Sequence, residues 1–326
     1  MAETVTTDIL IVGAGPVGLY GAYCAGFRGL RTVLVDALPE VGGQITALYP
    51  EKEIRDIAAV PGSRGREVVR ALKEQADTYA PTYLLGREAR TLAHSDGRPQ
   101  ITLDDGTVID AGAVVVTAGI GTFTPRTLPA GEDFLGRGLS YFVPDPADHA
   151  DRDVLVVGGG DSALDWALAL HPIARSVTLV HRRSTFRAHA ATVRAVHERG
   201  MAVVTDAQVR ALLGDDVLRE AHLAVAGEDE PRILKIDHVV AALGFISNLG
   251  PLLTWGIEIE RRAIRVDTRM QTTVDRVYAA GDITIYPGKI RLISVGFGEV
   301  ATAVNNAATT IDPELPLFPG HSTDAS

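Results

Sequence analysis

Two stretches of the chain repeat the same order of apolar and small residues. The apolar run Ile9–Val12 leads into the glycine-rich turn Gly13–Gly18, and the run Val154–Val157 leads into Gly158–Ala163. Each turn is followed by a helix-like stretch. A buried strand, a glycine turn and a helix in this order make up the dinucleotide-binding fingerprint, whose glycines let the backbone approach a pyrophosphate at a helix N-terminus. The chain is therefore predicted to bind two dinucleotides.

The hydrophobic pattern around the first fingerprint predicts alternating strands and helices. A strand ends at Val12, and the dipeptide Asp105-Gly106 between two short alternating runs indicates a hairpin. The other elements predicted for this half are a helix over 16–27, a strand over 32–35, a helix over 64–79, short strands around 101–103 and 107–109, and a buried strand over 114–118.

The pattern around the second fingerprint repeats that of the first. It predicts a helix over 162–169, a strand over 177–180 and a return strand over 238–243. A strand over 277–280 and a helix over 297–310 then resume the first unit. The fold class is thus predicted to be α/β, with two Rossmann-like dinucleotide-binding domains, the second inserted into the first.

The residues that end the second strand of each unit differ in charge. Asp36 stands 23 positions after Gly13, where the fingerprint places an acid that binds the ribose of a dinucleotide. Arg182 and Arg183 follow the corresponding strand of the second unit, and arginine forks suit a 2′-phosphate. The first unit, 1–118 with 245–326, is therefore predicted to bind FAD, and the inserted unit, 119–244, to bind NADPH.

Composition narrows the class of protein. The 326 residues carry a net charge of −10, which argues against general binding to nucleic acid or to a membrane surface. The only cysteine, Cys24, rules out an intramolecular disulfide and a dithiol relay, and the histidines show no metal-ligand spacing. Because the first residues lack the basic region of a signal peptide, the protein is predicted to be cytoplasmic.

Beyond the fingerprints, several motifs give the chain a family resemblance. It resembles the thioredoxin-reductase-type ferredoxin–NADP⁺ oxidoreductases over its whole length. The residues that carry the resemblance are the two fingerprints, Val41–Gln44, Ala47–Lys52, His181–Arg183, Ala280–Asp282, Tyr286–Lys289, Gly296–Glu299 and the tail Pro319–Thr323. The fingerprints occur in many flavoenzymes, whereas the blocks 43–52 and 282–299 and the tail are more specific.

The resemblance implies a set of cofactor contacts and an activity. Tyr49 would lie against one face of the isoalloxazine ring and His321 against the other, with such tails reaching across the partner subunit of a homodimer. Hydride would pass from nicotinamide C4 of NADPH to flavin N5, and single electrons would then pass to ferredoxin or flavodoxin, in either direction. The implied cofactor-binding positions are Gly13, Gly15, Gly18, Asp36, Gln44, Tyr49, Ala89, Phe123, Gly158, Gly160, Ala163, Arg182, Arg183, Asp282 and Thr323.

One segment separates this chain from the thioredoxin reductases that it also resembles. Those enzymes carry a redox-active cysteine pair just after a Ser-Tyr, where this chain has Phe142 and Pro144. Thiol exchange requires a thiolate, so electrons would leave the flavin directly. Two alternatives stay open: an NADPH-dependent flavin reductase of another acceptor (a quinone, oxygen or a partner's disulfide), and a non-enzymatic NADPH-sensing flavoprotein.

Overall fold

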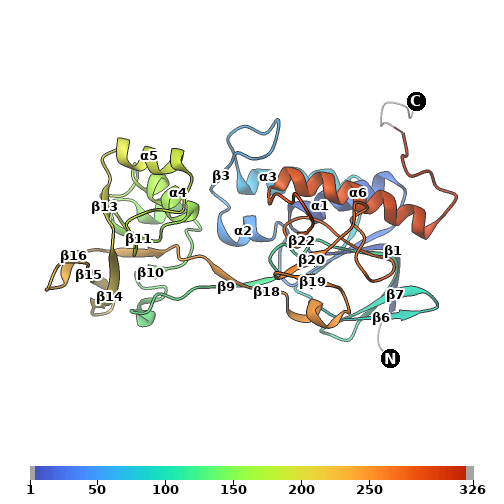
Figure 1. Ribbon diagram of the computed structural model, residues 1–326, viewed down its shortest axis with the longest axis horizontal. Coiled ribbons are helices and arrows are strands. Elements are labelled where there is room, and N and C mark those ends of the chain that lie inside the picture. Colours follow the sequence, from blue (N-terminus) through green and yellow to red (C-terminus); the bar gives the residue numbers. More distant parts are fainter. Residues whose placement is uncertain (1–3, 321–326) are drawn as a thin grey trace. The chain divides into compact units, whose positions relative to one another are not determined.

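The computed structural model describes residues 4–320, which form two compact units (Figure 1). One unit comprises the residues up to Thr122 and those from Ser247 onward, and the other comprises Phe123–Ile246. The mixed α/β class is confirmed. The structure divides the chain slightly later than the predicted boundaries at 118/119 and 244/245, and which dinucleotide each unit binds stays a prediction.

A seven-stranded sheet forms the centre of the first unit, and its order is β5-β2-β1-β8-β7-β6 with β21 beside β8. The parallel strands are β5 (Thr82–Leu85), β2 (Thr32–Asp36), β1 (Thr4–Val12), β8 (Val108–Val116) and β21 (Val277–Ala279). Helices α1 (Pro16–Phe27), α3 (Gly65–Asp77) and α6 (Ile293–Ile311) lie together along one side of this sheet in Figure 1. The sheet interior is a continuous core of Val, Ile, Leu and Ala, as expected for parallel strands covered by helices.

The antiparallel part of this sheet consists of β6 (Ala89–Ser95) and β7 (Arg98–Leu103), and β7 pairs with the first half of β8. The sequence predicted two separate strands, around 107–109 and over 114–118, but the structure has the single strand β8. Gly112 lies in its middle, and a Cβ there would be 2.7 Å from the carbonyl oxygen of Asp8. The glycine thus allows close approach to β1 without ending the strand. The remaining elements of the unit are α2 (Gln44–Leu48), β3 (Glu53–Ile54), β4 (Ser63–Arg64), η3 (Gly250–Thr254), β19 (Ile259–Glu260), β20 (Ala263–Arg265) and β22 (Thr284–Ile285).

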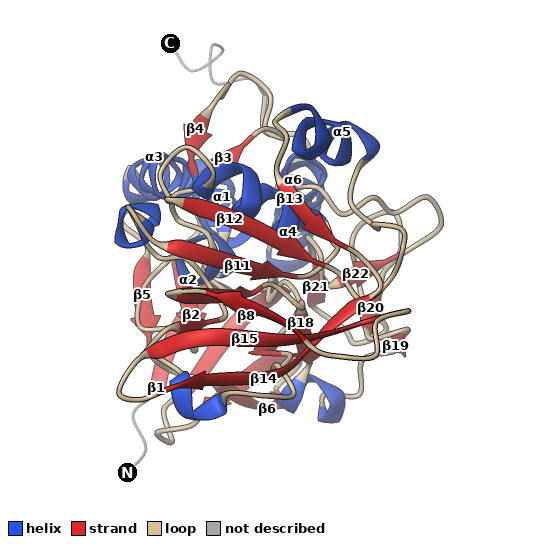
Figure 2. Cartoon of the chain, turned by 90° about the vertical axis from the view of Figure 1, so that its left-hand side faces the viewer, coloured by secondary structure: helices blue, strands red, loops and turns tan. Residues whose placement is uncertain are grey.

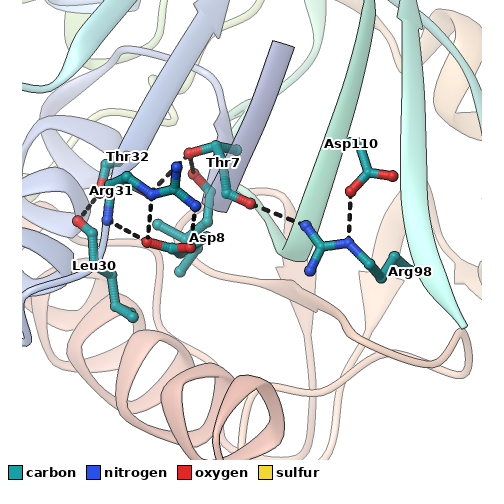
Figure 3. Close-up of polar contacts among 8 residues, drawn as sticks. Thr7, Asp8, Leu30, Arg31, Thr32, Arg98 and Asp110 are labelled. Atoms are coloured by element: carbon teal, nitrogen blue, oxygen red, sulfur yellow. Dashed lines mark hydrogen bonds and ion pairs between the residues drawn. The ribbon is translucent and has the colours of Figure 1, made fainter. Parts of the chain in front are cut away.

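Polar contacts join the strands near their amino-terminal ends, away from the glycine turn (Figure 3). Arg31 donates to both carboxylate oxygens of Asp8 and its own carbonyl accepts from Thr7 Oγ1, which joins the start of β2 to β1. Arg98 donates to Asp110 at 2.5 Å and to the carbonyl of Thr7 at 3.3 Å. The hydrogen bonds from Arg31 lower the pKa of Asp8, so this edge keeps its charge pairing at neutral pH.

A five-stranded parallel sheet, ordered β10-β17-β11-β12-β13, forms the centre of the second unit. Figure 2 shows β11, β12 and β13 of this sheet side by side, with the antiparallel strands β14 and β15 below them. The elements of this unit and its connections are β9 (Thr122–Pro125), η1 (Glu132–Phe134), β10 (Leu139–Ser140), η2 (Pro146–His149), β11 (Asp153–Val157), α4 (Asp161–Leu170), β12 (Ser176–Val180), α5 (Ala190–Glu198), β13 (Ala202–Val204), β14 (Ala207–Gly214), β15 (Leu218–Val225), β16 (Arg232–Lys235), β17 (His238–Ala241) and β18 (Phe245–Asn248).

Two histidines pack together at the amino-terminal edge of this sheet. The rings of His149 and His238 lie edge to face at 4.5 Å, and His238 Nε2 is 3.0 Å from Ser140 Oγ. Burial, and then the neighbouring charges of His149 and Arg152, lower the pKa of His238 to about 4. The folded protein therefore favours the neutral ring.

This lowered pKa predicts acid sensitivity of the second unit. Because the pKa of an unfolded histidine is about 6.5, the contribution of His238 to stability is complete above that pH. It is lost as the pH falls towards 4, and the loss reaches about 3 kcal/mol. We expect urea unfolding at about pH 7 and about pH 5 to show about 2 kcal/mol of this loss in the wild type and a smaller loss in His238→Gln. The exposed His197 is the control, and an equal benefit from His197→Gln would contradict the assignment.

Candidate functional site

The first glycine turn has no room for side chains at two positions. Gly13 has a φ of +114°, and a Cβ there would lie 2.6 Å from the carbonyl oxygen of Thr117. A Cβ at Gly18 would lie 1.8 Å from the carbonyl oxygen of Gly13. Gly15 caps α1, and no described side chain bonds to the free amides of this helix N-terminus. These amides are free to bind a phosphate, as the fingerprint predicts.

The carboxylate of Asp36 is directed at the same turn. Its Oδ2 accepts a hydrogen bond from the amide of Ala14 at 2.7 Å, and its Oδ1 accepts one from the amide of Leu38 at 2.8 Å. Burial raises the pKa of Asp36, and the two backbone hydrogen bonds oppose that rise. A carboxylate oxygen can accept two hydrogen bonds, so each retains capacity for a hydroxyl group.

The loop before α2 packs against the turn. The amide of Gly42 donates to the carbonyl of Ala14 at 2.8 Å, and a Cβ at Gly43 would lie 3.1 Å from the Cα of Gly15. Gln44 begins α2, and its Nε2 would lie 2.8 Å from a Cβ at Gly119. The glycine-rich loop therefore brings Gln44 beside the end of the sheet that carries the turn.

Tyr49 and Asp282 lie near one another although the sequence separates them widely. Tyr49 follows α2 and is partly buried against the core of the unit. Burial, and then the negative charges of Asp282 and Asp56, raise the pKa of Tyr49 to about 12. The phenol is therefore neutral at physiological pH, and it can act as a hydrogen-bond donor or an aromatic surface but not as a base.

The turn that carries Asp282 packs directly on the fingerprint helix. A Cβ at Gly281 would lie 3.2 Å from Cγ2 of Val17 in α1. Burial raises the pKa of Asp282, whereas the positive charges of Lys289 and Arg291 lower it. The structure thus collects the glycine turn, Asp36, Gln44, Tyr49 and Asp282 within one unit.

Four other predicted residues are not joined to this group by any described side-chain contact. Ala89 begins β6, and its methyl group is buried in the core, so only its backbone is available to a ligand. Phe123 lies in β9, and its side chain is not described. His321 and Thr323 lie outside the described residues.

The second glycine turn repeats the geometry of the first. The amide of Gly158 donates to the carbonyl of Val180 at 2.9 Å, and a Cβ at Gly158 would lie 2.4 Å from the carbonyl oxygen of Ala242. Ala163 is fully buried and packs against Gly158. Gly160 caps α4 with open space around it, and no described side chain caps that helix N-terminus. This turn also presents free amides to a phosphate.

Three arginines, Arg182, Arg183 and Arg187, lie near His181, the residue beneath the second turn. Arg182 and Arg183 are exposed in the loop after β12. The buried ring of His181 lies under the turn, since a Cβ at Gly159 would be 2.1 Å from its Cε1. Burial lowers the pKa of His181, a hydrogen bond to the carbonyl of Thr185 opposes this, and the neighbouring arginines lower the pKa further, which favours the neutral ring.

Arg187 is a candidate that the sequence reasoning missed. Its amide donates to the carbonyl of Gly159 at 2.8 Å, which fixes its loop to the turn. The signal was present in the sequence as a third arginine in the run 181–187. Its exposed side chain adds a third cation to those of Arg182 and Arg183.

Thiol and metal chemistry receive no support from the described residues. Burial raises the pKa of Cys24 to about 11, so its thiol is protonated at neutral pH and is a poor nucleophile. No group of three His, Cys, Asp or Glu side chains between residues 4 and 320 is placed to hold a metal ion. In the same range no helix is long and apolar enough to cross a membrane.

Comparison with protein families and solved structures agrees with this geometry. The model of the pyridine nucleotide-disulphide oxidoreductase family matches residues 7–307. The thioredoxin reductase of T. acidophilum superimposes with a TM-score of 0.80 and 25% identity, covering 93% of this chain and 98% of that one. The Rossmann-like fold class predicted from the sequence is thereby confirmed.

Similarity to curated proteins is higher and extends over nearly the whole chain. A ferredoxin–NADP reductase of Saccharopolyspora erythraea is 57% identical over 318 residues, covering 97% of each chain. A ferredoxin–NADP reductase of Thermus thermophilus is 45% identical over 324 residues, covering 98% of this chain and 97% of the relative. The chain therefore belongs to the pyridine nucleotide-disulphide oxidoreductases and, within them, to the ferredoxin–NADP reductase family.

Proposed function

We propose that this protein is an FAD-dependent oxidoreductase that transfers electrons between NADPH and ferredoxin. The observation that carries the proposal is the contrast between its two glycine turns. The first faces the carboxylate of Asp36, which suits ribose hydroxyls and repels a 2′-phosphate, and the second is flanked by Arg182 and Arg183. The full-length similarity to ferredoxin–NADP reductases supports the choice of acceptor.

The first unit fits FAD. The amides at the start of α1 would hold the pyrophosphate, and Asp36 would bind the adenosine ribose. Asp282 would bind hydroxyls of the ribityl chain, and Tyr49 would pack against the ring system. FAD bound there supplies the site that accepts hydride from NADPH and releases electrons singly. The protein's own task is positioning and electrostatics. Burial raises the pKa of Tyr49 to about 12, so this phenol is not a general base at neutral pH.

The second unit fits NADPH. The small residues Gly158 and Ala163 leave the backbone of the turn accessible to a ligand. The start of α4 has no side-chain cap and provides amides for the pyrophosphate. Arg182, Arg183 and Arg187 would hold the 2′-phosphate. His181 would support the turn from below as a neutral ring.

The acceptor is proposed to take electrons without a thiol intermediate. The single cysteine is partly buried and protonated at neutral pH, and Phe142 and Pro144 stand where thioredoxin reductases carry their cysteine pair. A homodimer in the cytoplasm is proposed with it, in which His321 and Thr323 of the tail complete the flavin site.

Anaerobic reduction of the purified protein by NADPH tests this function. We expect the flavin absorbance to bleach rapidly with NADPH and slowly with NADH, and the electrons to reach a low-potential ferredoxin but not thioredoxin. Bleaching without ferredoxin reduction would support an NADPH-dependent flavoenzyme but exclude ferredoxin as its acceptor. Bound FAD that NADPH does not bleach would favour an NADPH-sensing flavoprotein instead.

Docking of an acidic ferredoxin to this acidic protein requires a local basic surface. Exposed arginines of the second unit could provide it: Arg126, Arg137, Arg152 and Arg175. Arg175, however, is paired with Asp153 at 2.5 Å and with Asp237 at 2.8 Å, which cancels much of its charge. Arg137 donates hydrogen bonds to the backbone carbonyls of Asp133 and Asp216, which carry no net charge, so its positive charge is better available to a partner.

Salt dependence and charge reversal test this surface. Steered association slows about tenfold or more when salt screens the charges, so the rate of ferredoxin reduction is expected to fall steeply with ionic strength. Arg137→Glu should reduce the rate at low salt more than Arg175→Glu does. Reduction of ferricyanide, which needs no docking surface, is the control. A ferredoxin rate that is insensitive to salt would contradict the proposal.

A further inference from the structure

An ion pair with buried side chains contacts the turn that carries Asp282. Lys289 Nζ and Glu299 Oε1 are 2.5 Å apart, and the two side chains are only 6% and 5% exposed. Neither residue is among the predicted cofactor contacts. Removing two opposite charges from water is costly, and well-packed apolar residues in place of such a pair are often as stable or more stable. The hydrogen bonds that the pair makes with its neighbours therefore indicate a role beyond stability.

The pair holds both polar groups of a single residue, Gly281. The amide of Gly281 donates to Glu299 Oε2 at 2.7 Å, and its carbonyl accepts from Lys289 Nζ at 3.0 Å. Tyr286 donates to Glu299 Oε1 at 2.5 Å, and Thr284 donates to the carbonyl of Gly281 at 2.8 Å. The anion thus accepts from the amide while the cation donates to the carbonyl, and the opposite arrangement of charges would satisfy neither group.

Gly281 needs such a restraint. Its φ of +84° lies in the left-handed region, and it contacts Val17 of the fingerprint helix. The backbone of this residue determines where the next one, Asp282, is directed. Because glycine has the largest conformational freedom of all residues, an unrestrained turn would leave Asp282 without a fixed position.

We propose that Lys289 and Glu299 are positioning residues that hold the Gly281–Asp282 turn in the conformation that binds FAD. This inference rests on the proposed FAD site in the first unit. Lys289 has a second effect through charge. Burial raises the pKa of Asp282 and the positive charge of Lys289 lowers it, so the lysine helps to keep that carboxylate ionised.

The double variant Lys289→Met/Glu299→Leu separates positioning from stability. It replaces the pair with apolar side chains that fill the space but cannot bind the amide or carbonyl of Gly281. We expect the variant to keep the far-ultraviolet circular dichroism of the wild type and to bind FAD at least about tenfold more weakly, as measured by recovery of flavin fluorescence on dilution. FAD affinity equal to that of the wild type would overturn the proposal.

Glu299→Gln decides the question if the double variant does not fold. Glutamine has the shape of glutamate, but one of its two terminal atoms is an NH2 group, which donates hydrogen bonds. The side chain therefore cannot accept hydrogen bonds from both Gly281 and Lys289 through two separate oxygens. We expect the same tenfold loss of FAD affinity. The control is Lys73→Met, which breaks an ion pair of the same 2.5 Å length on the surface of α3 and should leave FAD affinity unchanged.

A pH profile adds a readout that simple loss of packing would not change. Lys289→Met leaves Asp282 facing Arg291 as its nearby cation, with Glu299 and Asp56 as anions and the neutral phenol of Tyr49. FAD affinity in this variant should fall at a higher pH than in the wild type as Asp282 takes up a proton. An unshifted profile would contradict the electrostatic part of the proposal. A wild type that binds FAD but does not reduce ferredoxin would refute the proposed acceptor while leaving this test valid.

Discussion

Replacing Arg182 and Arg183 together by alanine is expected to raise the KM for NADPH about 100-fold and to leave the KM for NADH nearly unchanged. A hydrogen bond to a charged group contributes about 1.5–3 kcal/mol, and exposure of both side chains places each one near or below the lower limit. Two such contacts, at roughly 1.4 kcal/mol each, give two factors of ten. The 2′-phosphate is what distinguishes the two coenzymes, so the loss should fall on NADPH alone.

Steady-state kinetics with both coenzymes and a common artificial acceptor measure this effect. Arg194→Ala is the matched control, since Arg194 is an exposed arginine on α5 of the same unit and does not flank the glycine turn. A proportional loss with NADH would mean that the two arginines support the fold of the loop rather than bind the phosphate. Unchanged kinetics with NADPH would place the phosphate elsewhere.

The elements next to each glycine turn could be predicted almost residue by residue. The helix predicted over 16–27 is α1 (Pro16–Phe27), and the strand predicted over 177–180 is β12 (Ser176–Val180). Interactions between residues close in the sequence determine these elements. At the start of α1, an apolar strand, a glycine with positive φ and a proline in the first helical turn each indicate the same boundary.

Other elements left no comparable signal. The five-residue helix α2 and the helix α5 are short, and the strands β14, β15 and β16 form a small sheet that exposes the apolar side chains of Leu213 and Ile233. The alternation in such strands is imperfect because bulges interrupt the register, as between Val209 and Ala211. Tertiary packing stabilises these elements, and the contacts involved cannot be predicted from the pattern of a single sequence.

The candidate site was predictable as a set of residues but not as an arrangement. Asp36 and Asp282 could be proposed from their places at strand ends. In the structure Asp36 accepts a hydrogen bond from the glycine turn, and the turn that carries Asp282 packs on the fingerprint helix. The pairing of Lys289 with Glu299 could not be proposed, because charged residues ten positions apart across a loop are usually solvated. Only the fold shows that both are buried and meet at Gly281.

Gly18→Ala is expected to abolish tight binding of FAD. A Cβ at this position would lie 1.8 Å from the carbonyl oxygen of Gly13 and 2.9 Å from Oγ1 of Thr117. Overpacking costs about 1–3 kcal/mol where neighbours can shift, and here the neighbour is the backbone of the turn itself. Moving that backbone displaces the amides that face the pyrophosphate, so we expect the upper end of that range, about a 100-fold weaker FAD complex.

The corresponding position of the second turn is occupied by Ala163, which makes the reciprocal change a matched control. Ala163→Gly removes a buried methyl group in the second unit and should leave FAD content unchanged while weakening NADPH binding only slightly. The ratio of flavin to protein absorbance after gel filtration measures FAD content in both variants. A yellow Gly18→Ala protein with the wild-type ratio would show that the first turn has more freedom than its close contacts imply. If the Gly13 carbonyl shifts in that variant without loss of FAD, the pyrophosphate does not bind at the start of α1.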